Sequence, residues 1–280
     1  IAYNHSSSPL SRPRLGILTG GGPAAGHNAI IWGAFVEANK NNADLIAIWN
    51  GFDGLVNPEL VYKARVLTYN DVWPYRAVGG TLLHTDRVNP FSKESVEKGI
   101  PDIIWNNIQK LNLAGVITAG GDDTNSGGAN LSIQHNNFPV VGVSKTMDND
   151  LNLPYNAPTY GFQTWVQRAA EQARYFTEEA KTLNRILVAE CFGRDSGYAP
   201  LGVGVMLGAA RTLIPEVQLN IEELLTDMEA YYKRFHYGIV IVSEAITINP
   251  TIGRNQQLFE EALEKDGLAK YMANKPAKKD

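Results

Sequence analysis

Three apolar segments of this 280-residue chain each run straight into a glycine-rich or polar stretch. Leu15–Thr19 precedes Gly20–Gly26, Gly115–Thr118 precedes two glycines and two aspartates, and Phe138–Val143 precedes Ser144–Asp150. Short apolar runs that alternate with amphipathic helices are typical of a mostly parallel sheet. Because ligands bind beyond the carboxyl ends of such strands, we expect the three loops to meet at one crevice.

The same alternation continues along the chain and predicts an α/β fold with doubly wound, mostly parallel sheets in two lobes. We expect further strands at Asp44–Ile48, Arg185–Glu190 and Tyr237–Ser243, and helices from about Asn28, over Glu94–Leu113, from about Thr124, over Gly161–Lys181 and over Asn220–Lys233. Residues 1–13 are expected to form a flexible tail, 14–155 a first lobe and 156–280 a second, with the boundary near Leu151–Tyr160.

Charge and composition exclude several classes of function. The net charge is −4, from 25 basic and 29 acidic residues, so no overall field attracts nucleic acid or an anionic membrane. No run of about 18 uncharged apolar residues predicts a spanning helix, and the first residues lack an apolar signal core. The single cysteine, Cys191, cannot form an internal disulfide, which favours a cytoplasmic location and a buried structural thiol.

The loops carry residue types that suit phosphate chemistry. A glycine turn between a strand and a helix offers backbone N–H groups to a phosphate, although Gly20–Gly26 fits neither a GxGxxG nor a Walker A pattern, and alone it is equally a tight turn. The acids Asp122, Asp123, Asp148 and Asp150 can together hold Mg²⁺ and accept a hydroxyl proton. The candidate cations for a phosphoryl group are Arg87, Lys145, Arg185 and Arg194, each of which by itself is more often a surface salt-bridge partner.

Six dispersed motifs resemble the phosphofructokinase family in their order and rough spacing, from about Leu15 to Ala245. They are TGGGPAAGHNAII, GGTLLHTDR, GGDDT, KTMDNDL, NRILVAECFGRDSGY and IVIVSEA. The resemblance implies a two-lobed enzyme, with a donor and Mg²⁺ lobe followed by a sugar-phosphate lobe. It would transfer a phosphoryl group, with Mg²⁺, to the C1 hydroxyl of fructose 6-phosphate, giving fructose 1,6-bisphosphate. It also implies a homodimer or homotetramer, with Arg185 supplied across a subunit interface.

The resemblance implies a role for each matching position. Asp148 would be the general base, with Arg194, Lys145 and Asp123 as further catalytic residues and Asp122 as the metal ligand. The donor site would comprise Gly21, Gly22, Arg87, Asp122, Asp123, Thr124 and Lys145. The sugar-phosphate site would comprise Thr146, Asp148, Asp150, Arg185, Phe192, Gly193, Arg194 and Glu244.

Two of these positions bear on the phosphoryl donor. Relatives that use ATP carry small glycines where this chain has Asp123 and Lys145, whereas relatives that use pyrophosphate carry an aspartate and a lysine. A carboxylate at Asp123 would intrude on the α-phosphate of ATP, and Lys145 can neutralise the product phosphate. The resemblance therefore implies pyrophosphate as the donor, with ATP as the alternative.

The sequence also departs from the family pattern. The loop with a glycine-histidine-glutamine-arginine core, which grips the sugar 6-phosphate in the family, does not follow Glu244-Ala245, so we expect either a chain incomplete at its C-terminus or a different acceptor grip. Pro23, Ala25 and Phe192 replace the usual residues. Two alternatives stay open: a kinase for another ketose phosphate such as sedoheptulose 7-phosphate, and a non-catalytic regulatory subunit of the same fold.

Overall fold

The computed structural model describes residues 12–22, 24–86 and 88–265. Their contacts divide the chain into two compact units. The first contains the described residues up to Met147 together with Leu151–Gln163, and the second contains Asp148–Asp150 together with the described residues from Thr164 onward. The assignment of donor and sugar-phosphate roles to the two lobes stays a prediction.

The first unit is built on a six-stranded sheet in the order β3-β2-β1-β4-β5-β6, in which only β3 is antiparallel to its neighbour. Its strands are β1 (Arg14–Thr19), β2 (Asp44–Ala47), β3 (Arg65–Val66), β4 (Leu113–Gly120), β5 (Val140–Thr146) and β6 (Tyr160–Gly161). Because β1, β4 and β5 are parallel neighbours, their carboxyl ends lie at one edge of the sheet, as the sequence predicts.

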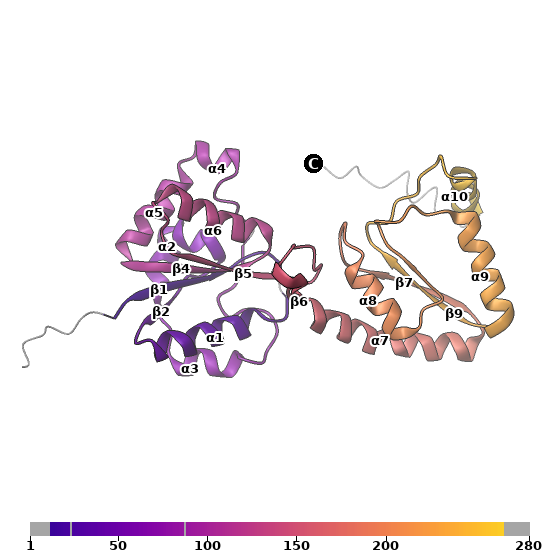
Figure 1. Cartoon of the computed structure of the whole chain (residues 1–280), viewed down its shortest axis with the longest axis horizontal. Helices are drawn as coiled ribbons and strands as arrows, with labels where there is room; N and C mark the ends of the chain where they lie inside the picture. Colours follow the sequence, from indigo (N-terminus) through magenta and orange to yellow (C-terminus); the bar gives the residue numbers. More distant parts are fainter. Residues whose placement is uncertain (1–11, 23, 87, 266–280) are drawn as a thin grey trace, which may run out of the picture. The chain divides into compact units, whose positions relative to one another are not determined.

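Helices cover both faces of this sheet (Figure 1). They are α1 (His27–Lys40), α2 (Pro58–Lys63), α3 (Tyr69–Val72), α4 (Lys93–Glu97), α5 (Ile100–Lys110) and α6 (Asp122–Gln134), with short 3₁₀ turns at Gly51–Leu55, Trp73–Tyr75 and Pro154–Asn156. Figure 1 shows α1 and α3 on one face and α5 and α6 on the other.

Two apolar cores form because side chains alternate between the faces of a strand. On β1, Ile17 points into the core beneath α1 and α3, and Leu18 points into the core beneath α5 and α6. On β2, Leu45 and Ile46 divide in the same way, and all four side chains are at most 2% exposed. Residues buried on both faces are what a parallel sheet between helices requires.

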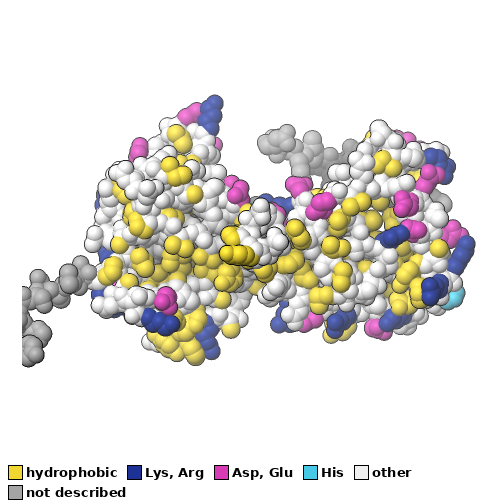
Figure 2. Space-filling model, in the orientation of Figure 1, with side chains coloured by type: hydrophobic (Ala, Val, Ile, Leu, Met, Phe, Trp, Pro, Cys, Tyr) yellow, Lys and Arg dark blue, Asp and Glu magenta, His cyan; other side chains and the backbone are white. Residues whose placement is uncertain are grey.

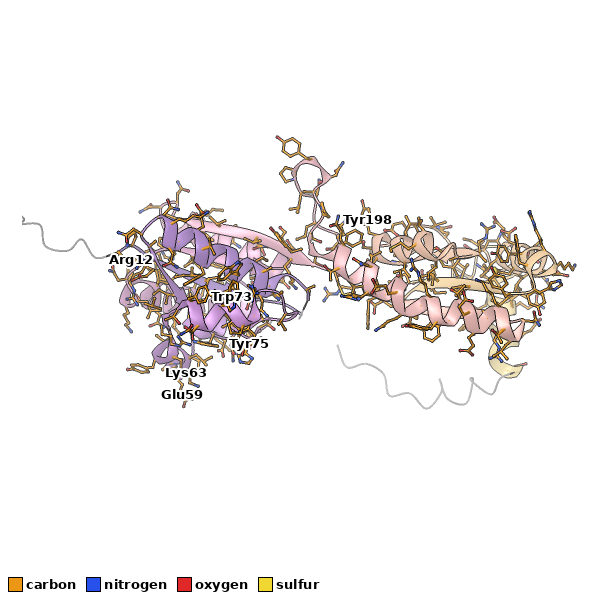
Figure 3. All side chains as sticks on the ribbon, turned by 90° about the horizontal axis from the view of Figure 1, so that it is seen from below. Arg12, Glu59, Lys63, Trp73, Tyr75 and Tyr198 are labelled. Atoms are coloured by element: carbon orange, nitrogen blue, oxygen red, sulfur yellow. The ribbon has the colours of Figure 1, made fainter. Side chains whose placement is uncertain are left out.

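Aromatic side chains fasten α3 to α1. Trp73 stacks on Tyr69 with 5.2 Å between ring centroids and meets Trp32 of α1 edge-on at 5.4 Å. The Arg76 guanidinium lies 3.4 Å from the Trp73 ring centroid, within cation–π range. Figure 3 labels Trp73 and Tyr75, which are both partly exposed on this side of the first unit.

The second unit has a parallel three-stranded sheet in the order β7-β9-β8. The strands are β7 (Ile186–Cys191), β8 (Arg211–Leu213) and β9 (Gly238–Ser243). The helices are α7 (Phe162–Leu183), whose first two residues belong to the first unit, α8 (Tyr198–Leu207), α9 (Ile221–Phe235) and α10 (Asn255–Lys265). The central strand β9 is almost entirely buried, but Val188 on the edge strand β7 is 68% exposed. Figure 2 shows other apolar side chains on the visible surface of this unit.

The α/β fold with mostly parallel sheets is confirmed, while some element boundaries differ from the sequence expectation. The single helix predicted over Glu94–Leu113 is two helices, because Gly99 between them adopts a φ of 68° that ends α4. Lys145 and Thr146, expected in a loop, are the last residues of β5. Arg12, expected in the tail, lies 3.2 Å from Asp44 in an ion pair. Among the described residues, no helix has the length and apolar character needed to cross a bilayer.

Candidate functional site

The ends of β1 and β4 meet around one buried threonine. Thr124, in the first turn of α6, is 6% exposed, and a Cβ on Gly20 or Gly120 would come within 2.3 Å or 2.5 Å of its Oγ1. The Gly20 N–H also donates to the Ala119 carbonyl oxygen over 2.9 Å. Two glycines are therefore required for the strands to approach the helix this closely. The described contacts give Thr124 a packing role beneath the loops, and its predicted contact with the donor stays a prediction.

The glycine loop and β5 form a small cradle lined by backbone and one ammonium group. Lys145 is 4% exposed, and its Nζ donates to the Gly22 carbonyl oxygen over 2.8 Å. A Cβ on Gly21 would lie 3.7 Å from that Nζ and 3.9 Å from the Gly121 backbone nitrogen. A Cβ on Gly22 would meet no described atom within 4 Å, so this side of the loop is open. The predicted donor residues Gly21, Gly22 and Lys145 thus lie together.

The glycine loop is held in place by the loop that precedes Arg87. The Gly21 N–H donates to the Asp86 carbonyl oxygen over 2.9 Å, while the Asp86 carboxylate accepts from the backbone N–H groups of Asp53 (2.8 Å) and Val88 (3.2 Å). Burial raises the pKa of Asp86 above its usual value, against the effect of the Asp53 and Val88 hydrogen bonds. Arg87 itself, predicted to bind the donor, lies outside the described residues.

A buried histidine beneath the loop was not predicted as a site residue. His27 opens α1 with 0% exposure, and neither ring nitrogen makes a hydrogen bond among the described atoms. Burial, and then the nearby charge of Lys145, lowers its pKa from 6.5 to about 4. The Ala119 and Gly20 carbonyl groups favour the protonated ring but do not meet hydrogen-bond geometry. A neutral imidazole therefore lies close to the Lys145 ammonium.

Asp122 and Asp123 occupy the first turn of α6 and are exposed. Asn89 Nδ2 donates to Asp123 Oδ1 over 3.4 Å. Among the described side chains, no three of the types His, Cys, Asp and Glu gather into a group that can hold a metal ion. Mg²⁺ is usually bound through one or two carboxylates together with water and substrate phosphates, so the two exposed carboxylates Asp122 and Asp123 fit such an ion.

The second unit brings Asp148, Arg194 and Glu244 together where β7 and β9 end. Asp148 is 9% exposed, and its Oδ2 lies 4.0 Å from Arg194 Nε. Glu244 follows β9, and its Oε1 accepts hydrogen bonds from the backbone N–H groups of Gly193 (3.2 Å) and Arg194 (2.9 Å). Arg194 has a φ of 49°, a conformation that costs free energy for a non-glycine residue, and the two hydrogen bonds to Glu244 help to hold it.

For three further predicted residues, the structure gives their exposure or a backbone hydrogen bond. Phe192, two residues before Arg194, is 61% exposed, and Asp150 is exposed. Thr146 ends β5, and its carbonyl oxygen accepts from Thr159 Oγ1 over 2.7 Å. Their predicted contacts with substrate stay predictions.

Arg185 is separated from this group within its own chain. It precedes β7, whereas Phe192–Arg194 follow it, so a strand of about 20 Å lies between them. Its guanidinium lies 3.6 Å from Glu179 Oε1.

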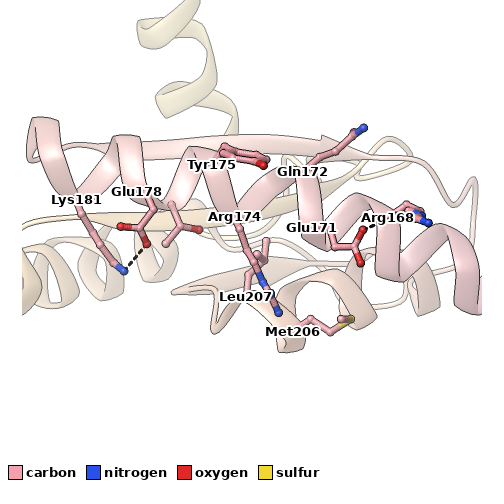
Figure 4. Close-up of a pocket in the computed structure, with 10 residues that line it drawn as sticks. Arg168, Glu171, Gln172, Arg174, Tyr175, Glu178, Lys181, Met206 and Leu207 are labelled. Carbon is pink, nitrogen blue, oxygen red and sulfur yellow. Dashed lines mark hydrogen bonds and ion pairs between the residues drawn. The ribbon is translucent and has the colours of Figure 1, made fainter.

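A hollow of about 870 Å³ lies along α7 (Figure 4). It is lined by Arg168, Glu171, Gln172, Arg174, Tyr175, Thr177, Glu178, Lys181, Met206 and Leu207. Two ion pairs, Arg168–Glu171 and Lys181–Glu178, both at 2.9 Å, already partner four of its charges. None of the residues predicted for chemistry lines it.

Comparison with known proteins yields relatives over most of the chain. A family model described as phosphofructokinase matches residues 14–277. The pyrophosphate–fructose 6-phosphate 1-phosphotransferase of Thermotoga maritima is 38% identical over 205 residues, which cover 72% of this chain and 48% of that protein. The protein of the same name from Naegleria fowleri is 31% identical over 277 residues, covering 92% and 62%. The chain thus spans about half to two thirds of the length of these relatives.

Relatives named for the other donor are similarly close. The ATP-dependent 6-phosphofructokinase of Natranaerobius thermophilus is 33% identical over 243 residues, covering 86% of this chain and 72% of that protein. Among solved structures, phosphofructokinase from Saccharomyces cerevisiae matches with a TM-score of 0.74 at 24% identity, over 88% of this chain and 33% of that one. Pyrophosphate-dependent phosphofructokinase from Nitrosospira multiformis matches with a TM-score of 0.74 at 18% identity, over 91% and 66%. At these identities the structures show the fold alone.

Proposed function

The chain belongs to the phosphofructokinase family, and on that premise we propose that it transfers a phosphoryl group from pyrophosphate to the C1 hydroxyl of fructose 6-phosphate. The observation that carries the choice of donor is Lys145, whose Nζ lies at the glycine loop and bonds to the Gly22 carbonyl oxygen. A fixed ammonium there suits a small, highly charged donor and its phosphate product.

In this proposal the first unit binds the donor. The backbone around Gly21 and Gly22 and the ammonium of Lys145 neutralise phosphate oxygens. Mg²⁺, held through Asp122, would supply further neutralisation of the donor charge. Asp123 extends from the first turn of α6, where its volume and charge disfavour the α-phosphate of a nucleotide.

The second unit binds the acceptor and removes its proton. Asp148 accepts the proton of the C1 hydroxyl while the C1 oxygen attacks a phosphorus atom of pyrophosphate; the bridging P–O bond breaks, and inorganic phosphate leaves. Arg194, 4.0 Å from the Asp148 carboxylate, supplies positive charge beside the reacting groups. Glu244 orders the backbone of Gly193 and Arg194 through its Oε1.

Formation of fructose 1,6-bisphosphate from fructose 6-phosphate tests the proposal, with Mg²⁺ present and with pyrophosphate and ATP supplied in parallel. We expect turnover with pyrophosphate and at least tenfold slower turnover with ATP, because Asp123 would repel the α-phosphate of ATP. A factor of ten in rate corresponds to about 1.4 kcal/mol in the activation barrier. The same assay with sedoheptulose 7-phosphate measures acceptor choice.

The four combinations of donor and acceptor distinguish the proposed function from its alternatives. Turnover with ATP alone would contradict the role of Lys145 and Asp123 and leave an ATP-dependent kinase. Turnover only with sedoheptulose 7-phosphate would show that this sugar, and not fructose 6-phosphate, is the acceptor. No turnover with any of the four donor and acceptor pairs would contradict the proposed catalysis and favour a non-catalytic subunit of this fold.

A further inference from the structure

Ser196 joins two segments that carry predicted catalytic side chains. Its side chain is 7% exposed, and its Oγ donates to the carbonyl oxygen of Asp148, 48 residues away, over 2.8 Å. Its backbone N–H donates to the Gly193 carbonyl oxygen over 3.0 Å, which closes the turn that contains Arg194. One buried residue therefore contacts both the Asp148 segment and the Arg194 turn.

The turn around Ser196 is itself fixed from several directions. The Gly197 N–H donates to Glu216 Oε1 over 2.6 Å, and Glu244 Oε1 accepts from Gly193 and Arg194 on the other side. A Cβ on Gly193 would lie 2.5 Å from the Ser196 carbonyl oxygen, so the backbone is tightly folded there. The Ser196 hydroxyl is thus held by a rigid support.

The segment Asp148–Asp150 belongs to a different compact unit from the residues on either side of it in the chain. Residues Asp148–Asp150 cluster with the second unit, although Met147 before them and Leu151 after them cluster with the first. A short segment that leaves one compact unit and returns needs contacts to keep its place, because ordering each residue costs about 1–2 kcal/mol of conformational entropy. The hydrogen bond from Ser196 to the Asp148 backbone supplies such a contact.

We infer that Ser196 is a positioning residue that places Asp148 beside Arg194. This inference rests on the proposed function, in which Asp148 accepts the proton of the acceptor hydroxyl. Loss of the Ser196 hydroxyl removes no charge, only the hydrogen bond to the Asp148 carbonyl oxygen. It allows the Asp148 main chain to shift, and a displacement of about 1 Å in a catalytic group costs on the order of 100-fold in rate.

Three substitutions test the hydroxyl. Ser196→Ala removes it, Ser196→Cys keeps the approximate size but weakens the donor, and Ser196→Thr retains it. Thr226→Val is the control, since Thr226 Oγ1 donates to the Glu222 carbonyl oxygen over the same 2.8 Å in the same unit but far from the predicted residues along the sequence. Amide hydrogen exchange of a peptide covering Asp148–Asp150 reports the anchoring, and kcat and KM report the chemistry.

We expect Ser196→Ala to speed exchange over Asp148–Asp150 and to lower kcat, each by tenfold or more, with KM for both substrates within about threefold of the wild type. Ser196→Cys should give an exchange rate and a kcat between those of Ser196→Ala and the wild type. Ser196→Thr and Thr226→Val should match the wild type in both measurements. A purely structural role would lower the amount of folded enzyme without this split between kcat and KM.

The two measurements separate failure of the inference from failure of the proposed function. Unchanged exchange in Ser196→Ala and Ser196→Cys would overturn the anchoring, and faster exchange with unchanged kcat would overturn the positioning role. If the wild-type protein turns over no donor and acceptor pair, the proposed function fails and the catalytic part of the inference fails with it. Hydrogen exchange still decides in that case whether Ser196 anchors the segment.

Discussion

At the scale of single residues, Lys145 and Asp123 carry the donor preference that we propose. Replacing both by glycine should lower kcat/KM with pyrophosphate by roughly 30-fold to 150-fold, because a charge-assisted contact to phosphate contributes about 2–3 kcal/mol. The ratio of ATP to pyrophosphate activity should rise. Removing Lys145 takes away an Nζ that lies 3.7 Å from where a Cβ on Gly21 would be, which opens the cradle.

Steady-state kinetics with both donors measure this change. Lys233→Ala is the matched control, since that lysine is exposed and pairs with Glu229 in α9, a helix that carries no predicted site residue. A double variant that keeps the wild-type preference for pyrophosphate would show that donor choice is set elsewhere.

The second residue-scale prediction concerns the buried imidazole of His27 and acid stability. The unfolded chain takes up a proton near pH 6.5, while the folded chain does so only near pH 4. Stability is therefore lost as pH falls from 6.5 towards 4 and levels off below. The contribution of His27 to the loss between pH 7 and pH 5 is about 2 kcal/mol.

His27→Met should remove this contribution and, at pH 7, stabilise the first unit by about 1–3 kcal/mol, since a buried polar group with no hydrogen bond among the described atoms is replaced by an apolar one. Urea unfolding at pH 7 and pH 5 measures both effects. His84→Asn is the control, because His84 is exposed and its φ of 58° suits asparagine. An equal pH dependence in His27→Met and the wild type would contradict the assignment.

At the scale of elements, the sequence predicts those whose local pattern agrees with their packing. β1 and β4 are short apolar runs beside glycines, and both appear within two residues of the predicted bounds. Helix α8 was not predicted, because Pro200, Gly202 and Gly204 lower helix propensity. In the structure, a Cβ on Gly202 would come within 2.9 Å of Val166 Cγ1, so close tertiary packing requires glycines that the local pattern disfavours.

Some residues of the candidate site could be predicted from the sequence, whereas others could be found only in the folded structure. Gly21, Gly22 and Lys145 belong to motifs at strand ends, and the topology of a parallel sheet brings such residues together. Ser196 also lies in a motif, but its bond to Asp148 spans 48 residues and leaves no local signal. His27 could be noticed as a histidine beside a glycine loop, yet its burial and the lack of a hydrogen bond to any described atom follow only from the folded chain.

At the scale of the whole molecule, the position of Arg185 bears on subunit assembly. Within one chain it lies at the amino end of β7, and Arg194 follows the carboxyl end, about 20 Å away. An arginine side chain cannot span that distance. If Arg185 binds the substrate, as the family resemblance implies, it must do so in the site of a second copy of the chain.

Mixing two inactive variants tests this requirement. In a twofold dimer of Asp148→Asn with Arg185→Ala, one site receives Asp148 from one chain and Arg185 from the other, while the second site lacks both. Random mixing makes half of the dimers mixed, so we expect recovery of about a quarter of wild-type activity when subunits are allowed to exchange. Asp148→Asn mixed with Arg194→Ala is the control. Those two side chains lie 4.0 Å apart in one chain, so each site of every dimer lacks one of them and activity should not return. Recovery in the control, or none with Arg185→Ala, would place Arg185 outside a shared site.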